Sequence, residues 1–409
     1  MAAPITTRGE EPQDAAALRS AMVHALRERG AIVSEPVAAA MTAVPRHLFV
    51  PERPPAEAYD ADNALPVKHD ARGAATSTVS APCIHATMLE QAGIEPGMRV
   101  LEIGSGGYNA ALLAELVGDG GRVVSADIDP DIVRRARDLL EATGYDRVEV
   151  VEADAEHGVP DGAPYDRIIV TAGAWDIPPA WIRQLTENGR LVVPLRLKGL
   201  TRVVAFDRVG ETLVGRDYRL AAFVPMQGAG AHSERLAPLD EGVMLCVDDE
   251  ALKFDVEELR AALRGPRVER WSGAAFDLPD ELELFLMTGS PRTALLHADE
   301  KLIRQGRFAP SAAGWVPTLI ADGGIAYRVK RTNEETGGFE TGVFAHGPAA
   351  ETLAERYVEL LRRWAHRHRR RGAARIRYLP GGVDAPAEAE EPSGGLIPKR
   401  HGVVEVTWS

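Results

Sequence analysis

Closely spaced glycines follow an acidic residue in the segment 100–110, which reads VLEIGSGGYNA. The apolar run ends near Glu102, the turn contains Gly104 and Gly106, and an apolar helical pattern continues over residues 110–117. Only glycine lets a backbone approach a bulky ligand this closely at a tight turn. The segment therefore predicts a strand, a turn and a helix that together bind a nucleotide-like cofactor.

A second acid, Asp127, ends the next predicted strand, about 20 residues after the glycines, where doubly wound folds place a ribose-binding carboxylate. The run Asp127-Ile128-Asp129-Pro130 also reads as a helix cap, so a capping role for Asp127 and a ribose role for Asp129 stay open. The turn lacks the third glycine of a dinucleotide fingerprint and the lysine of a phosphate loop. An E-x-G-x-G turn with an acid after the next strand is typical of S-adenosylmethionine-dependent methyltransferases.

Length and composition restrict the class of protein. The 409 residues suffice for two domains, and 45% hydrophobic with 26% charged residues is usual for a soluble globular protein. A net charge of -13 disfavours nonspecific nucleic-acid or anionic-membrane binding, so we expect neither partner. Cys83 and Cys246 build no disulfide framework, and we expect no metal. Without an apolar span or leader, we expect a cytoplasmic protein.

Strands and helices alternate over residues 99–194, which predicts a parallel sheet with helices on both faces. We therefore expect an α/β fold, a Rossmann-like doubly wound class I methyltransferase domain over residues 14–228, after a disordered N-terminus at 1–13. Residues 229–409 are expected to form a C-terminal α+β domain. Residues 52–80 are expected to be an irregular loop, Ser80 to cap a helix over 82–92, and Asn188-Gly189 to form a turn after a helix.

Residues 15–225 resemble protein L-isoaspartyl O-methyltransferases. Four ordered blocks carry the resemblance: VPRHLFVP at 44–51, VSAPCIHA at 79–86, the glycine turn with Tyr108 and Asn109, and YDRIIVTAG at 165–173. The turn is one residue shorter than is usual in that family, and residues 69–73 are inserted before Val79. The C-terminal half has no counterpart in the simple repair enzymes.

These departures resemble the actinobacterial branch associated with ribosomally synthesised modified peptides (RiPPs) such as lanthipeptides and graspetides, the FxLD-type methyltransferases. The resemblance implies an enzyme that methylates a chosen aspartate of a modified precursor peptide. The ester then collapses to an aspartimide (succinimide), or to isoaspartate after hydrolysis. General repair, the methylation of isoaspartyl sites in many proteins, is the alternative; the extra C-terminal half favours a dedicated substrate.

A carboxylate substrate needs orientation more than activation, because its pKa near ~4 leaves it nucleophilic at neutral pH. Alignment with the sulfonium methyl and removal of water then dominate the reaction. We therefore expect orienting hydroxyls and no Ser-His-Asp triad. Ser80 and Thr78 are the predicted catalytic residues, Ser80 because it matches the substrate-contacting hydroxyl of the family. A purely capping role for Ser80 stays open.

The resemblance also implies a set of cofactor contacts. Asp127 would bind the ribose, Asp154 the adenine amino group and Ala155 the neighbouring ring atom through its amide, whereas Glu102 would shape the methionine side. A loop role for Asp154 and a packing role for Tyr108 stay open. The predicted cofactor-binding residues are Glu102, Gly104, Ser105, Gly106, Tyr108, Asn109, Asp127, Ile128, Asp154, Ala155 and Thr171.

Residues 362–371, RRWAHRHRRR, form a basic run in an acidic protein. Such a run is usually a solvated helix face. It also suits the docking of an acidic peptide, and its arginines and tryptophan suit RNA less well.

Overall fold

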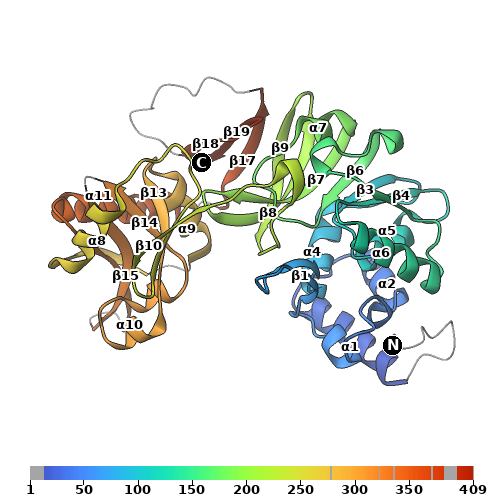
Figure 1. Ribbon diagram of the computed structural model, residues 1–409, viewed down its shortest axis with the longest axis horizontal. Helices are drawn as coiled ribbons and strands as arrows, with labels where there is room; N and C mark the ends of the chain where they lie inside the picture. Colours follow the sequence, from blue (N-terminus) through green and yellow to red (C-terminus); the bar gives the residue numbers. More distant parts are fainter. Residues whose placement is uncertain are drawn as a thin grey trace. The chain divides into compact units, whose positions relative to one another are not determined.

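The computed structural model describes residues 13–276, 279–321, 323–334, 337–369, 372–381 and 394–408. The predicted disordered N-terminus lies outside these residues, except for Gln13, where the first helix begins. The chain divides into two compact units (Figure 1). The first runs to Leu195 and adds Thr201–His232 and Arg400–Gly402; the second holds Arg196–Leu200, Ser233–Lys399 and the chain from Val403. The predicted domain bounds, 14–228 and 229–409, stay a prediction, since each of these units combines several separate segments of the chain.

The first unit opens with short helices and a β-hairpin. The helices are α1 (Gln13–Glu28), α2 (Glu35–Ala43) and α3 (Pro55–Ala58), and the hairpin strands are β1 (Leu65–His69) and β2 (Ala75–Val79). The irregular loop predicted over 52–80 was therefore wrong. Asp70 closes the hairpin, because its carboxylate accepts hydrogen bonds from the amides of Arg72 and Ala74, and Gly73 has a φ of +83°. This Asx turn is the feature that the sequence interpretation missed.

A sheet forms the centre of the first unit, and the strands that it has in this unit follow the order β9-β8-β7-β6-β3-β4-β5. Strands β5, β4, β3, β6 and β7 run parallel, and β8 and β9 form an antiparallel pair. This confirms the predicted Rossmann-like doubly wound fold. The strands are β3 (Arg99–Ile103), β4 (Arg122–Asp127), β5 (Glu149–Glu152), β6 (Tyr165–Val170), β7 (Leu185–Leu197), β8 (Leu200–Val209) and β9 (Thr212–Leu220).

Helices connect and cover the parallel strands. They are α4 (Pro82–Ala92), α5 (Tyr108–Val117), α6 (Pro130–Thr143) and α7 (Pro179–Gln184). Helix α5 packs on β3 and β4, α6 packs on β4 and β5, and α4 packs on β6. Strand β3 pairs with both β4 and β6, so the strand order reverses beside it. In such sheets the ligand-binding crevice lies at this reversal, beyond the carboxyl ends of the strands.

Two local predictions need correction. Helix α4 has the predicted range, but its N-cap is Ala81, and no side chain caps it. Asn188 and Gly189 do not form a turn after a helix, because β7 begins directly after α7. The pairing register of β6 with β7 shifts between the pairs Tyr165–Leu185 and Arg167–Arg190. Asn188 and Gly189 therefore lie in a bulge within β7.

The second unit is an α+β structure around an antiparallel sheet with strand order β10-β11-β13-β14-β15-β16-β12. The strands of this sheet are β10 (Arg235–Asp240), β11 (Val243–Val247), β12 (Arg267–Ala275), β13 (Thr293–Ala298), β14 (Val316–Ala321), β15 (Gly324–Asn333) and β16 (Gly338–His346). Outside this sheet, the second unit also contains β17 (Arg375–Pro380), β18 (Gly394–Pro398) and, except for its first residue, β19 (Gly402–Thr407). Its helices are α8 (Val256–Arg264), α9 (Pro279–Thr288), α10 (Glu300–Arg304) and α11 (Ala350–Arg363).

The basic run extends from the end of α11 into a π-helical turn, Trp364–His368. Trp364 and His368 are buried and pack against Phe285 and Trp408, so the run is not simply a solvated face. Arg370 and Arg371 lie outside the described residues. In the described part of the chain, no helix has the length and apolar character that a membrane crossing needs.

Candidate active site

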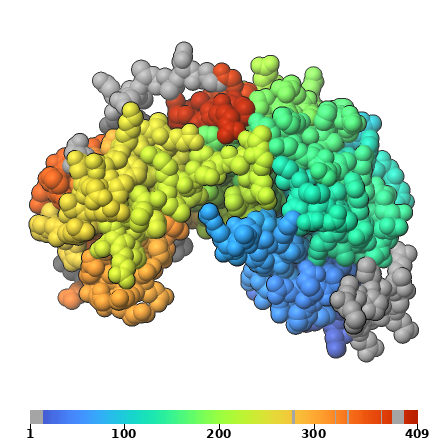
Figure 2. Space-filling model, in the orientation of Figure 1, coloured from blue at the N-terminus to red at the C-terminus, as the bar shows by residue number. Residues whose placement is uncertain are grey.

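A pocket lies at the carboxyl ends of β3 and β4, where the strand order reverses. Three walls surround it: the glycine turn and the strand ends, the hairpin strand β2, and the segment that follows β9. Its lining residues are Thr76, Ser77, Thr78, Ile103, Gly104, Ser105, Gly106, Ala126, Asp127, Ile128, Asp129, Ile132, Ala153, Ala155, Thr171, Ala172, Val224, Pro225, Met226 and Gln227. In the space-filling view the hairpin region (blue) adjoins the central strands and helices (teal) (Figure 2).

The glycine turn is held against the end of β6. Gly104 has a φ of +95°, and a Cβ there would lie 2.4 Å from Thr171 Oγ1. The Thr171 hydroxyl contacts the Gly104 carbonyl at 2.9 Å, and the Gly104 amide donates to the Ala126 carbonyl at 2.8 Å. No larger residue fits this position without displacing Thr171. The turn thus stays close to both neighbouring strands and leaves the pocket open in front of it.

Asp127 and Asp129 both line the pocket but are bound differently. The Asp127 carboxylate accepts hydrogen bonds from the amides of Ser105 and Asp129, each at 2.9 Å, and burial raises its pKa. Asp129 caps α6 by accepting from the Asp131 amide, and it also binds Lys68 Nζ at 2.6 Å. The helix cap predicted as an alternative role for Asp127 is therefore provided by Asp129.

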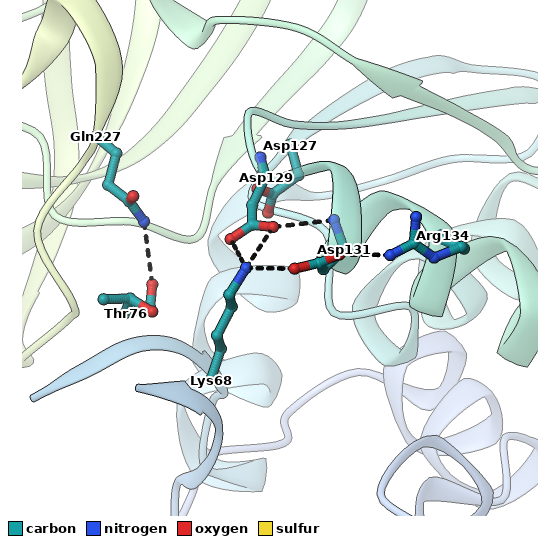
Figure 3. A network of polar contacts seen from close by, with 7 residues as sticks. All are labelled: Lys68, Thr76, Asp127, Asp129, Asp131, Arg134 and Gln227. Atoms are coloured by element: carbon teal, nitrogen blue, oxygen red, sulfur yellow. Dashed lines mark hydrogen bonds and ion pairs between the residues drawn. The ribbon is translucent and has the colours of Figure 1, made fainter. Parts of the chain in front are cut away.

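Figure 3 shows Lys68 extending from the hairpin to Asp129 and Asp131. Beside it, the side-chain amide of Gln227 faces the Thr76 carbonyl at 3.4 Å. These contacts connect the hairpin with the other two walls of the pocket, through Lys68 on β1 and Thr76 on β2.

Glu102 lies behind the turn and does not line the pocket. It is fully buried, accepts a hydrogen bond from Asn109 Nδ2 at 2.8 Å, and accepts another from the Ser125 hydroxyl. The hydroxyls of Ser125 and Ser105 lie 2.8 Å apart. Burial raises the pKa of Glu102 to about 7, against the opposing effect of its two hydrogen bonds. Glu102 thus links β3, α5, β4 and the turn.

The structure separates the predicted site residues into two groups. Those that line the pocket are Thr78, Gly104, Ser105, Gly106, Asp127, Ile128, Ala155 and Thr171. Those that do not are Ser80, Glu102, Tyr108, Asn109 and Asp154. Tyr108 is buried between the rings of His85 and Phe49. The Asp154 carboxylate accepts from the amides of Glu156 and Ala229. The roles assigned to all thirteen residues, lining or not, stay predictions.

Several lining residues escaped the sequence analysis. Thr76 and Ser77 fell within the predicted loop, although the threonines and the valine of ATSTV at 75–79 are residue types that favour a strand. Residues 224–227 follow the last strand of the sheet and carry no motif. They are placed by long-range pairing, because the Gly173 amide donates to the Val224 carbonyl and the Met226 amide donates to the Gly173 carbonyl.

The pocket suits S-adenosylmethionine. Asp127 presents a carboxylate beside the turn, as a ribose diol requires, and Ile128, Ile132 and Ala155 provide an apolar surface for a flat base. The close approach of the turn matches a ligand that lies on its backbone. Among the described residues, no group of three His, Cys, Asp or Glu side chains is placed to hold a metal ion.

Comparison with known proteins places this site in a family. The profile of the family "Protein-L-isoaspartate(D-aspartate) O-methyltransferase (PCMT)" matches residues 17–231. A protein-L-isoaspartate O-methyltransferase of Methanococcoides burtonii is 41% identical over 208 residues, which are 51% of this chain and 98% of that protein. One of Methanopyrus kandleri is 41% identical over 219 residues, 53% of this chain and 94% of the relative.

A solved structure of a protein-L-isoaspartate O-methyltransferase matches with a TM-score of 0.50 and 25% identity, over 88% of this chain and 96% of the other. That match extends well into the C-terminal half, which therefore has a counterpart in one protein of that name, whereas the two relatives above align over nearly their whole lengths to only about half of this chain. The chain belongs to the protein-L-isoaspartate O-methyltransferase family and is an S-adenosylmethionine-dependent protein carboxyl O-methyltransferase.

Proposed function

We propose that this enzyme methylates the side-chain carboxylate of an aspartate in a ribosomally synthesised modified peptide. The ester would then close to an aspartimide or, after hydrolysis, give isoaspartate. The observation that carries the carboxylate assignment is the row Thr76, Ser77 and Thr78 on β2, which lines the pocket opposite the glycine turn. Hydroxyl and amide donors in such a row orient a carboxylate without neutralising it.

The reaction is an in-line displacement. The cofactor supplies a methyl group made electrophilic by its sulfonium. A carboxylate oxygen forms the new bond to the methyl carbon, and the carbon–sulfur bond breaks with its electron pair left on sulfur. No proton has to move, so a general base is unnecessary. The chain's task is to align the carboxylate and to exclude water.

We assign the orientation of the substrate carboxylate to Thr78 and Ser80. Thr78 lines the pocket, and Ser80 is two residues further along the same segment, 9% exposed. A capping role does not account for Ser80, since Ala81 caps α4 without a side-chain bond. We assign the ribose to Asp127 and Ile128, the adenine to Ala155 with Asp154 behind it, and the methionine side to the turn that Glu102 and Asn109 support.

Two features favour a dedicated peptide. The inserted residues 69–73 lie at the tip of the hairpin whose strand β2 lines the pocket, which supports a role for them in contacting residues beside the methylated one. We also propose that the C-terminal domain, 229–409, recognises the peptide, with exposed residues of the basic run such as Arg362 and Arg367. The second half alone is a weaker argument than the sequence implied, because a structural relative shares it.

General repair of isoaspartyl sites is the second candidate. It is favoured by the relatives named protein-L-isoaspartate O-methyltransferase, which align over 94–98% of their own lengths at 41% identity. The pocket and its chemistry would be the same; only the accepted carboxylate would differ.

Mass spectrometry distinguishes the two substrates. The full chain is incubated with S-adenosylmethionine and three peptides: a cyclised modified peptide of this class, its linear form, and a generic isoaspartyl peptide. Addition of one methyl followed by loss of methanol, on the cyclised peptide alone, is the expected result. Methylation of the isoaspartyl peptide in preference would establish repair and refute the dedicated substrate. Thr78→Val should lower the rate on the accepted peptide, and Thr78→Ser should retain most of it.

A further inference from the structure

Three residues near the C-terminus, Arg400–Gly402, group with the first unit. His401 Nε2 lies 2.6 Å from a carboxylate oxygen of Glu156, and the His401 amide donates to Asp176 Oδ2 at 2.6 Å. Arg400 Nη1 donates to the Ala229 carbonyl at 2.7 Å. More than 170 residues of chain separate the two sides of each contact.

The partners of these residues belong to two walls of the cofactor pocket. Glu156 lies in the 3-10 turn Ala155–His157, whose first residue lines the pocket. Ala229 comes two residues after Gln227, which also lines it. The two walls are joined directly as well, because the Ala229 amide donates to Asp154 Oδ2 at 2.9 Å. Arg400 therefore holds the segment around Ala229, and His401 holds the 3-10 turn that follows Asp154. These are the two sides of the contact between Ala229 and Asp154.

The segment around Ala229 is tightly seated. Gly228 has a φ of +74°, and a Cβ there would lie 2.5 Å from both Asp154 Oδ2 and Ile128 Cδ1. Ile128 is itself a lining residue. A small displacement of residues 227–229 would thus reach the base-binding side of the pocket.

The His401–Glu156 contact is partly buried. The side chain of His401 is 24% exposed and that of Glu156 is 14% exposed. Hydrogen bonds to charged groups in such surroundings contribute more than exposed ion pairs, whose contribution is close to zero. The contact is therefore strong enough to influence the position of the 3-10 turn.

We infer that Arg400 and His401 are positioning residues for the cofactor: they hold the segments 155–156 and 227–229 in the arrangement that binds the adenosine part of S-adenosylmethionine. Neither touches the reacting atoms. The inference holds for either candidate substrate, since it concerns cofactor binding alone.

Calorimetric titration of the full chain with S-adenosylhomocysteine tests this inference without any substrate. His401→Ala should raise the Kd by about fivefold to twentyfold, the range expected for loss of one partly buried charged hydrogen bond. Arg400→Ala should raise the Kd by a smaller factor, because its hydrogen bond to the Ala229 carbonyl is exposed to solvent. His401→Gln should recover part of the affinity, because its amide can still donate to Glu156. In turnover assays, the KM for cofactor should rise while kcat at saturating cofactor and the KM for peptide stay near wild type.

His24→Ala is the matched control. His24 also pairs with a glutamate, Glu28, at 3.4 Å, but on α1 and away from the pocket lining, so its Kd should equal that of the wild type. If His401→Ala loses its cooperative thermal transition, Glu156→Gln tests the same contact with the shape of the side chain preserved. A Kd within about twofold of wild type for folded Arg400→Ala together with a folded variant at either end of the His401–Glu156 contact would overturn the inference.

Discussion

Asp127 and Glu102 lie near the ends of adjacent strands, yet their surroundings give them different tasks. Asp127 receives two backbone amides and still lines the pocket, so its charge is available to a ligand. Glu102 is buried behind the turn with both carboxylate oxygens engaged by Asn109 and Ser125. Removal of Asp127 should therefore affect cofactor affinity, and removal of Glu102 should affect the stability of the turn.

Asp127→Asn should weaken S-adenosylhomocysteine binding by about tenfold to a hundredfold, because a hydrogen bond to a charged group contributes about 1.5–3 kcal/mol. Asp129→Asn is the comparison, since that carboxylate already caps α6 and pairs with Lys68. It should weaken binding less. Calorimetry of both variants compares the two losses of affinity. A larger loss for Asp129→Asn would show that Asp129, and not Asp127, binds the ribose.

Glu102→Gln tests the buried carboxyl through pH. The folded pKa of about 7 exceeds the ordinary value of 4.5, so the folded state holds the proton more tightly than the unfolded state. The wild type therefore loses stability as pH rises through the window between these values, and the loss is complete above the folded pKa. Between about pH 5 and about pH 8, its free energy of unfolding should fall by about 2–3 kcal/mol relative to that of Glu102→Gln. Urea denaturation at both pH values measures this, and parallel curves would contradict a raised pKa.

At the scale of elements, the pocket depends on how the glycine turn and the hairpin meet the strand ends. The turn is fixed by Thr171 of the segment after β6, and the hairpin by Lys68 on Asp129 and Asp131. Thr76 on β2 faces Gln227 across the opening. The glycine turn and the segment at 224–227 are thus irregular walls, whereas the third wall is the regular strand β2.

Gly104→Ala should disrupt the turn, because it combines a φ of +95° with a Cβ 2.4 Å from Thr171 Oγ1. Gly73→Ala is the matched control: its φ is +83°, but its Cβ would meet nothing within 4 Å. The control should lose about 1–2 kcal/mol of stability from backbone strain alone. Gly104→Ala should lose clearly more and also lose cofactor binding. Equal losses in thermal denaturation would show that the turn tolerates a side chain.

At the scale of the whole molecule, sequence patterns sufficed where contacts are local or the motif is chemical. The strand–turn–helix at 99–117 and the acid after β4 were predicted at or near their places, because periodicity and glycine spacing specify them. Patterns could not place residues 224–227 or Arg400 and His401 beside the pocket. Those positions depend on pairing over long stretches of chain.

The hairpin shows a different limit. Its strands are short and half exposed and lack a clear apolar–polar alternation, so this stretch resembled a loop rich in Pro, Asp and Gly. Similarly, serine is a residue type that often caps helices, yet Ala81 and not Ser80 occupies the N-cap position of α4. Local propensity is weak in both places.

The most direct test of the account is the chemical form of the transferred methyl group. The full chain is given S-adenosylmethionine labelled in the methyl group, with an isoaspartyl peptide and a cyclised modified peptide as acceptors. If the carboxyl group is methylated, mild base treatment should release the label as volatile methanol. The Asp127→Asn variant should incorporate less label, to the extent that its affinity for the cofactor is lower. A label that survives base would show transfer to nitrogen, sulfur or carbon, and would contradict a carboxylate as the nucleophile.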